Sequence, residues 1–151
     1  MFVEYATEVT APLGAVENNL ERVRANLEEW ADIAYRDGEQ LTARVGPTEY
    51  IAHRVELKIG VARFQRSGLV YAVHWRAIGA TVLFPVLNAD LVLTNVGADR
   101  TTITLRGTYE PPLGVVGRLA DRAILGRLAE ATVRNWVDRL AGELNSQPQP
   151  R

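Results

Sequence analysis

A pair of prolines followed by one long amphipathic helix closes this chain and limits the folds that it can adopt. Pro111 and Pro112 lack backbone donors and fix φ, so neither a strand nor the interior of a helix can include both of them. A helix must therefore begin after them. Between Val116 and Leu144, apolar or small residues recur at spacings of three and four, with charged residues on the opposite side. This stripe needs a broad apolar surface to cover, and strands earlier in the chain can supply one.

Length and composition indicate a single globular domain. The chain has 151 residues, of which 47% are hydrophobic, which is enough for one substantial core but cramped for two. We expect the domain to cover residues 1–144. The polar, proline-rich residues 145–151 are expected to form a disordered tail.

Charge and cysteine content exclude several classes of function. With a net charge of -1, the chain lacks the positive excess that non-specific nucleic-acid binding needs. It contains no cysteine, which excludes disulfides, thiolate nucleophiles and cysteine-based metal sites. The longest uncharged run, residues 77–89, is too short to span a bilayer, and the first residues do not form a signal segment. We therefore expect a cytoplasmic protein with no cofactor, no metal and no integral membrane segment.

The first part of the chain is expected to form a strand followed by helical structure. Residues 2–9 alternate between apolar and polar side chains, as in a half-buried strand. Thr10 is placed to cap the next helix, and Pro12 suits its first turn. Asn18 and Asn19 could divide this segment, so one or two short helices are predicted. Their apolar stripe consists of Val16, Leu20, Val23, Leu27, Trp30 and Ala34.

The middle of the chain has the alternation of an antiparallel meander, with a hairpin turn at residues 66–68. After the first strand, the predicted strands cover residues 41–45, 51–61, 69–77, 89–94 and 102–110. Odd-numbered residues are expected to face inward in every strand. The predicted fold class is α+β: a curved antiparallel sheet of about six to seven strands, wrapped around the long C-terminal helix.

Three short segments add a local pattern to this order of elements. They are Trp75-Arg76, Leu83-Phe84-Pro85 and Gly107-x-Tyr109-x-Pro111-Pro112-x-Gly114-x-x-Gly117-x-x-x-Asp121. With them, the chain resembles the START-like superfamily, also called the SRPBCC, Bet v 1-like or polyketide cyclase/dehydrase group, over residues 2–144. The resemblance implies a helix-grip fold. It also implies an internal cavity, between the sheet and the C-terminal helix, that takes a lipid, a sterol, a polyketide or a similar hydrophobic molecule.

The inward-facing positions indicate which residues would line such a cavity. Four of them carry aromatic residues, Tyr5, Tyr71, Trp75 and Tyr109, which either fill a core or line a pocket with a few polar groups. Small residues on the long helix either leave room for a ligand or allow close approach to the sheet. The predicted lining consists of Trp30, His53, Val55, Leu57, Tyr71, Val73, Trp75, Leu91, Leu93, Ile103, Leu105, Tyr109, Ala123, Gly126 and Ala129.

His53 and Arg63 are the candidates for catalysis. His53 lies among inward-facing apolar residues, where it could orient a ligand or act as a general base, although a purely structural histidine is the favoured interpretation. Arg63 is odd-numbered, so the strand alternation would turn it inward, where it could stabilise an enolate. A bulge at Gly60 would instead turn Arg63 to solvent, and this is the interpretation that we favour. His74 has the opposite parity from His53, so the two histidines are not expected to share a metal.

Three functions remain open at this point. The first is a non-enzymatic protein that binds, carries or sequesters a hydrophobic small molecule. The second is a cyclase- or dehydratase-like enzyme that uses His53 or a tyrosine as acid or base. Such an enzyme needs at least two convergent titratable groups, and the sequence offers one good candidate. The third is a homodimerising interaction module that uses the apolar segment of residues 78–87.

Overall fold

The chain folds into one antiparallel sheet with helices on one face. The computed structural model describes residues 2–31, 33–34, 54–66, 68–78, 86–110 and 122–146. Its strands are β1 (Phe2–Val9), β2 (Arg54–Ile59), β3 (Arg63–Gln65), β4 (Gly68–Ile78), β5 (Val86–Asn95) and β6 (Thr101–Glu110). Its helices are α1 (Leu13–Val23), the 3-10 helix η1 (Arg24–Asn26) and α4 (Arg122–Ser146), with a further helical segment at residues 27–31.

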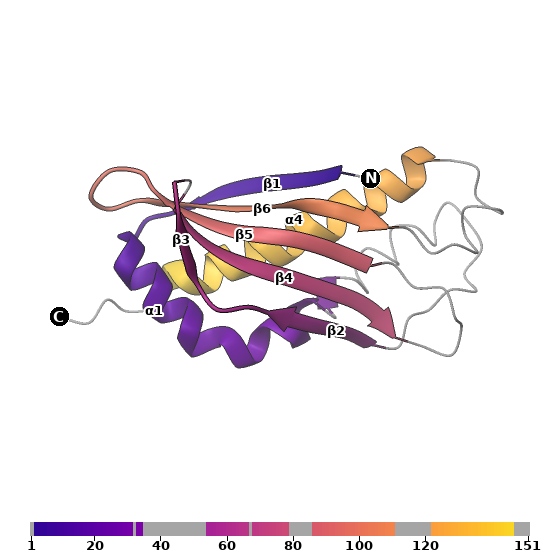
Figure 1. Ribbon diagram of the computed structural model, residues 1–151, viewed down its shortest axis with the longest axis horizontal. Coiled ribbons are helices and arrows are strands. Elements are labelled where there is room, and N and C mark those ends of the chain that lie inside the picture. Colours follow the sequence, from indigo (N-terminus) through magenta and orange to yellow (C-terminus); the bar gives the residue numbers. More distant parts are fainter. Residues whose placement is uncertain are drawn as a thin grey trace.

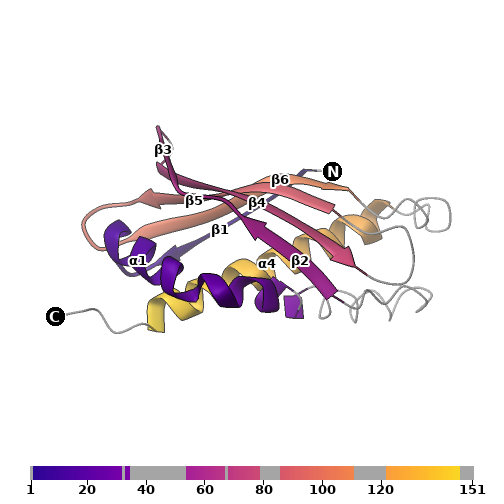
Figure 2. The same cartoon turned by 60° about the horizontal axis from the view of Figure 1, so that its bottom comes forward.

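These elements form two layers, a sheet and a layer of helices. The sheet has the order β1-β6-β5-β4-β2, and β3 pairs with β4 beyond the end of β2 (Figure 1). α1 and α4 both lie against the same face of this sheet (Figure 2). The predicted α+β helix-grip fold is confirmed, with six strands in the described part of the chain. Neither α1 nor α4, within that part, combines the length and the apolar character that crossing a membrane requires.

The core lies between the two layers, and it confirms most of the predicted inward-facing residues. All six residues of the predicted N-terminal apolar stripe are buried. The buried residues of the sheet that face the helices include Val3, Val9, Leu69, Tyr71, Val73, Trp75, Leu87, Leu91, Leu93, Ile103, Leu105 and Tyr109. α4 contributes Val133, Trp136, Val137, Leu140 and Leu144. Odd-numbered residues of β4, β5 and β6 face inward because side chains alternate strictly along an undisturbed strand.

Trp136 connects three parts of this core. Its indole Nε1 donates a hydrogen bond to the carbonyl oxygen of Leu27, at 3.2 Å, so α4 is tied to the N-terminal helical segment. Its ring meets Trp75 of β4 edge to face, with the ring centroids 5.7 Å apart and an interplanar angle of 83°. This T-shaped contact is a favoured geometry for aromatic pairs. The middle of α4 is therefore fixed both to the sheet and to the N-terminal helical segment.

Gly107 allows two strands of the sheet to approach unusually closely. It pairs with Ala89 of β5 and with Val3 of β1. A Cβ atom at position 107 would lie 2.1 Å from the carbonyl oxygen of Asn88 and 2.4 Å from the Cα of Ala89. Both distances are far below van der Waals contact, so any side chain here would force the backbone of β5 and β6 apart.

One extra residue between β2 and β3 breaks the alternation that the sequence predicts. Ile59 pairs with Val73, whereas Arg63 pairs with Val70, so residues 60–62 face only two residues of β4. This is a β-bulge, and it reverses the side-chain parity beyond Gly60. The prediction that odd-numbered residues face inward in every strand is therefore wrong here. Val61, which was predicted to face inward, is exposed, and Arg63 is exposed as the favoured interpretation of a bulge at Gly60 predicted.

The start of α1 differs from the prediction in two respects. Thr10 does not cap the helix, because Ala11 intervenes and Pro12, with φ of -67°, occupies the N-cap position. The backbone N–H of Thr10 donates instead to Asn145 Oδ1, at 2.9 Å. Asn18 and Asn19 do not divide the helix, since their weak propensity is overridden by packing, and the irregular turn comes later, at η1.

The end of α4 also differs from the prediction. The helix continues through Asn145 to Ser146, past the expected start of the tail at residue 145. The hydrogen bond that Asn145 accepts from Thr10 explains why the helix is retained there. Residues 147–151 and the predicted strand at 41–45 lie outside the described residues. The domain limits and the disordered tail therefore stay predictions.

Candidate ligand-binding site

Most of the predicted cavity lining lies on the inner face of the sheet, against α1 and α4. Tyr71, Leu91, Leu93, Ile103 and Leu105 are fully buried. Trp30, Val73, Trp75 and Tyr109 are at most 5% exposed, and Leu57 is partly buried against the same core. The structure thus places these ten residues in one hydrophobic core, nine from the sheet and Trp30 from the helical segment at residues 27–31.

The structure does not place the remaining predicted site residues on this inner face. His53 lies outside the described residues, and of Val55 only the backbone is described, paired with Ala77. The small residues predicted to face the cavity lie near the start of α4, where the helix backbone alone is described. They are Ala123, Gly126 and Ala129. Arg63 is exposed on β3, as the favoured interpretation of a bulge at Gly60 predicted, so the alternative role inside the cavity is wrong.

Tyr71 carries the polar group that stands out on the inner face. The side chain is fully buried, and its hydroxyl has no hydrogen-bond partner among the described residues. Burial raises the pKa of Tyr71 to about 12, and the negative charges of Glu21 and Glu17 add to this rise. The hydroxyl is therefore protonated at neutral pH and can donate a hydrogen bond. Buried polar groups without partners are rare and costly, which makes this hydroxyl a candidate contact for a ligand.

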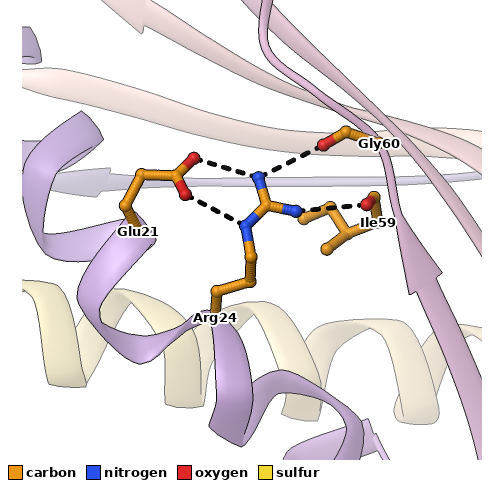
Figure 3. Close-up of polar contacts among 4 residues, drawn as sticks. All are labelled: Glu21, Arg24, Ile59 and Gly60. Carbon is orange, nitrogen blue, oxygen red and sulfur yellow. Dashed lines mark hydrogen bonds and ion pairs between the residues drawn. The ribbon is translucent and has the colours of Figure 1, made fainter.

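A polar network around Arg24 holds α1 and η1 to the bulge beside Tyr71 (Figure 3). Arg24 Nε and Nη2 donate to the two carboxylate oxygens of Glu21, at 3.0 and 2.9 Å. Nη1 and Nη2 also donate to the carbonyl oxygens of Ile59 and Gly60, at 3.1 and 3.2 Å. The hydrogen bonds from Arg24 lower the pKa of Glu21. The guanidinium carbon lies 5.9 Å from the Tyr71 ring centroid, so the network closes this edge of the inner face.

The opposite edge of the inner face is closed by Tyr5 of β1. Its hydroxyl donates to Asp138 Oδ1 of α4, at 2.6 Å, and Arg134 lies 5.6 Å from the centroid of its ring. The hydrogen bond to Asp138 raises the pKa of Tyr5. Tyr5 was predicted as an inward aromatic residue, but its partly buried side chain reaches the solvent side of α4. It therefore clamps the helix to the sheet and does not offer a free polar group.

The outer face of the sheet carries a groove that the sequence did not predict. Its volume is about 550 Å³, and small residues at Gly60 and Ala72 lie beneath it. The polar residues around it are Lys58, His74, Asn88, Asp90, Arg106 and Thr108. His74 Nδ1 forms a hydrogen bond with Asn88 Oδ1, and Lys58 Nζ lies 3.7 Å from Glu56 Oε1.

In the described part of the chain, no group of three or more potential metal ligands is present. With charges of both signs, the groove indicates no particular ligand class.

Solved structures with similar folds come from several bacteria. A conserved protein from Geobacillus kaustophilus is 14% identical, with a TM-score of 0.56, and the match covers 95% of each chain. A protein from Helicobacter pylori is 12% identical, with a TM-score of 0.53 and coverage of 94% of this chain and 86% of that one. A protein from Thermus thermophilus is 15% identical, with a TM-score of 0.50 and coverage of 95% and 97%. No protein-family model and no curated protein sequence matches the chain.

Identities this low show the fold alone. The chain has the helix-grip fold that its sequence pattern predicted, in which an antiparallel sheet wraps around a long C-terminal helix. In this fold the inner face described above is the surface that faces the helix. It is therefore the surface on which a buried ligand would lie.

Proposed function

We propose that this protein binds a hydrophobic small molecule between the inner face of the sheet and α4. The observation that carries the proposal is the character of that face, which combines many buried apolar side chains with the buried hydroxyl of Tyr71, for which the described residues offer no hydrogen-bond partner. Ligand sites for hydrophobic molecules have this composition, with many apolar contacts and a few polar groups that fix orientation. The small residues at the start of α4 would supply the volume.

A role in carrying or sequestering this molecule fits the described side chains better than catalysis. A cyclase- or dehydratase-like reaction needs two convergent groups, an acid or base and a group that stabilises developing charge. Arg63 was the candidate for the second group, and it is exposed on β3. The tyrosine hydroxyl of Tyr71 remains protonated far above neutral pH, which makes it a hydrogen-bond donor and a poor general base.

The homodimer alternative involves the segment of residues 78–87. Residues 79–85 lie outside the described part of the chain, and Leu87 is fully buried in the core of the subunit. A buried Leu87 cannot contribute to a subunit interface in this conformation. The alternative stays a prediction for the remainder of the segment.

Native mass spectrometry of the freshly purified protein, combined with titration of a fluorescent fatty-acid probe, tests the proposed function. We expect a co-purified small molecule or, after its removal, saturable binding of the probe at micromolar concentrations and displacement by other hydrophobic molecules. Trp75 and Trp136 are in contact in the core, so their fluorescence should change on binding. Absence of saturable binding to fatty-acid, sterol and polycyclic aromatic probes alike would refute the proposal.

A further inference from the structure

A hairpin formed by β3 and the beginning of β4 extends from the side of the sheet that lies away from the helices (Figure 2). We define the β3 hairpin as residues 61–66 and 68–70, which include β3 and the beginning of β4. It projects beyond the sheet and away from α1 and α4 (Figure 2). The bulge after Ile59 interrupts the pairing of β2 with β4 and bends the chain before β3 resumes the pairing.

Two large apolar side chains of the β3 hairpin are directed into solvent. Val61 and Phe64 are each 83% exposed, the highest values among the large apolar side chains that the structure describes. Phe64 pairs with Leu69, which is fully buried, so the two residues of this pair have entirely different environments. An exposed phenylalanine at a projecting tip contributes nothing to the core. Its burial therefore requires a partner outside the folded chain.

The same hairpin carries unbalanced positive charge. Arg63 and Arg66 are exposed, and neither has a carboxylate partner among the described residues. The sequence has no acidic residue between Glu56 and Asp90, although the whole chain has a net charge of -1. The positive charge is therefore local and accompanies the exposed apolar side chains.

We propose that the β3 hairpin docks the protein on an anionic lipid surface. Phe64 and Val61 would enter the boundary between headgroups and acyl chains, while Arg63 and Arg66 would bind lipid phosphates. A lipid surface fits better than a protein partner because a stable protein interface needs about 800 Å² on each side, whereas only two large apolar side chains of the hairpin are exposed. Interfacial insertion needs only a few apolar side chains supported by basic ones. The docking does not depend on the proposed ligand.

Vesicle co-sedimentation tests the docking with the complete chain. We expect binding to vesicles that mix phosphatidylcholine with phosphatidylglycerol, little binding to pure phosphatidylcholine, and loss of binding at high salt. Phe64→Ala should weaken binding about 10-fold, because it removes the apolar insertion. Arg63→Gln and Arg66→Gln should each weaken it about 5-fold. All three residues are exposed, so the variants should fold as the wild type does.

Two matched controls separate the hairpin from general effects of composition. Phe2→Ala removes another exposed phenylalanine, on β1 at the opposite edge of the sheet, and Arg22→Gln removes an exposed arginine from α1. Both variants should bind vesicles as the wild type does. Because the chain has no cysteine, Phe64→Cys and Phe2→Cys can each be labelled uniquely with an environment-sensitive dye. Only the dye at position 64 should shift to the blue when anionic vesicles are added.

Three results would overturn the docking proposal. The first is no binding to anionic vesicles at low salt. The second is binding that Phe64→Ala and Phe2→Ala reduce equally, or that is as strong on neutral vesicles. The third is self-association without lipid that Phe64→Ala abolishes, which would assign the β3 hairpin to an interface between copies of the chain. Loss of docking with retained binding of a soluble fatty-acid probe would leave the proposed function intact.

Discussion

The buried hydroxyl of Tyr71 has no hydrogen-bond partner among the described residues, and the proposed ligand would supply one. In most folded proteins a buried hydroxyl finds a partner, and leaving it unpaired costs about 1–3 kcal/mol. Here the described neighbours of Tyr71 offer no hydrogen bond, although Glu21, Glu17 and Arg24 are close enough to influence its pKa. A ligand with a carbonyl, ether or hydroxyl oxygen would satisfy this donor. The cost to the free protein would then be recovered on binding.

Tyr71→Phe should therefore leave the free protein intact. Because the lost hydroxyl has no described partner, the free energy of unfolding should stay within about 0.5 kcal/mol of wild type or rise by up to about 1 kcal/mol. Denaturant titration at neutral pH measures this. A loss well above 1 kcal/mol would mean that the hydroxyl is engaged in the free protein and would remove the argument for a polar ligand contact.

The raised pKa of Tyr71 also predicts a pH dependence of stability. The pKa is about 12 in the folded chain against 10.0 for an ordinary tyrosine, so at intermediate pH the unfolded chain loses a proton that the folded chain keeps. Stability contributed by the protonated hydroxyl is complete below pH 10 and is lost as the pH rises through about 12. Over that window, unfolding titrations should show a steeper loss for wild type than for Tyr71→Phe. Parallel curves would contradict the assigned pKa.

Arg24 is the residue whose role was least accessible from sequence. Its acceptors include two backbone carbonyls, of Ile59 and Gly60, more than thirty residues away, and backbone acceptors have no side-chain signature. Arg24→Met keeps much of the apolar stem but removes every hydrogen bond, so we expect a loss of about 1–3 kcal/mol in denaturant titration. Arg22→Met, at an exposed position of α1, is the matched control and should change stability by less than about 0.5 kcal/mol. Equal effects would mean that the network contributes nothing.

At the scale of elements, strand patterns were predictable wherever the ladder is regular. Side chains alternate with a period of two, so the inward-facing residues of β4, β5 and β6 followed directly from parity. The alternation failed between Gly60 and the end of β3, because one inserted residue reverses the side chains of this segment. A glycine inside an alternating run was the available signal, and it correctly marked the possibility of a bulge.

Helix ends were less predictable than strand faces. Capping by Thr10 required a helix that starts directly after it, but two more residues, Ala11 and Pro12, precede the start of α1. The extension of α4 to Ser146 depends on a hydrogen bond between Asn145 and Thr10, which are far apart in the sequence. Long-range contacts of this kind decide where a helix ends, and local sequence does not record them.

The close approach of β5 and β6 at Gly107 gives a prediction about sheet geometry. Gly107→Ala places a methyl group against the backbone of Asn88 and Ala89, so we expect a loss of at least about 1–3 kcal/mol. Gly142→Ala is the control, because a Cβ there meets nothing within 4 Å and α4 should gain about 0.5–1 kcal/mol from the lower backbone entropy. Thermal or denaturant unfolding of the two variants should move in opposite directions. A tolerated Gly107→Ala would contradict the strand packing described here.

At the scale of the whole molecule, the two faces of the sheet are assigned different tasks. The inner face, with α1 and α4, is proposed to hold a hydrophobic molecule, while the β3 hairpin on the other side is proposed to meet a lipid surface. The fold was predictable, because element order and hydrophobic period define it. The identity of a ligand was not, since apolar surface carries little information about the shape of the molecule it binds. The hairpin between β3 and β4 was predicted, but the exposure of Val61 was not, because the odd-numbered positions were expected to face inward.

Binding of a fluorescent fatty-acid probe to two variants of α4 tests whether a ligand lies between the inner face of the sheet and this helix. In the sequence, Gly126 precedes the buried Val133 by seven residues, or two helical turns, so we expect it on the stripe that faces the sheet, whereas Gly142 is exposed. We predict that Gly126→Leu abolishes saturable probe binding while the protein stays folded, because the larger side chain fills the space proposed for the ligand. Gly142→Leu should bind as the wild type does. Unchanged affinity in folded Gly126→Leu would contradict a ligand site between the sheet and α4.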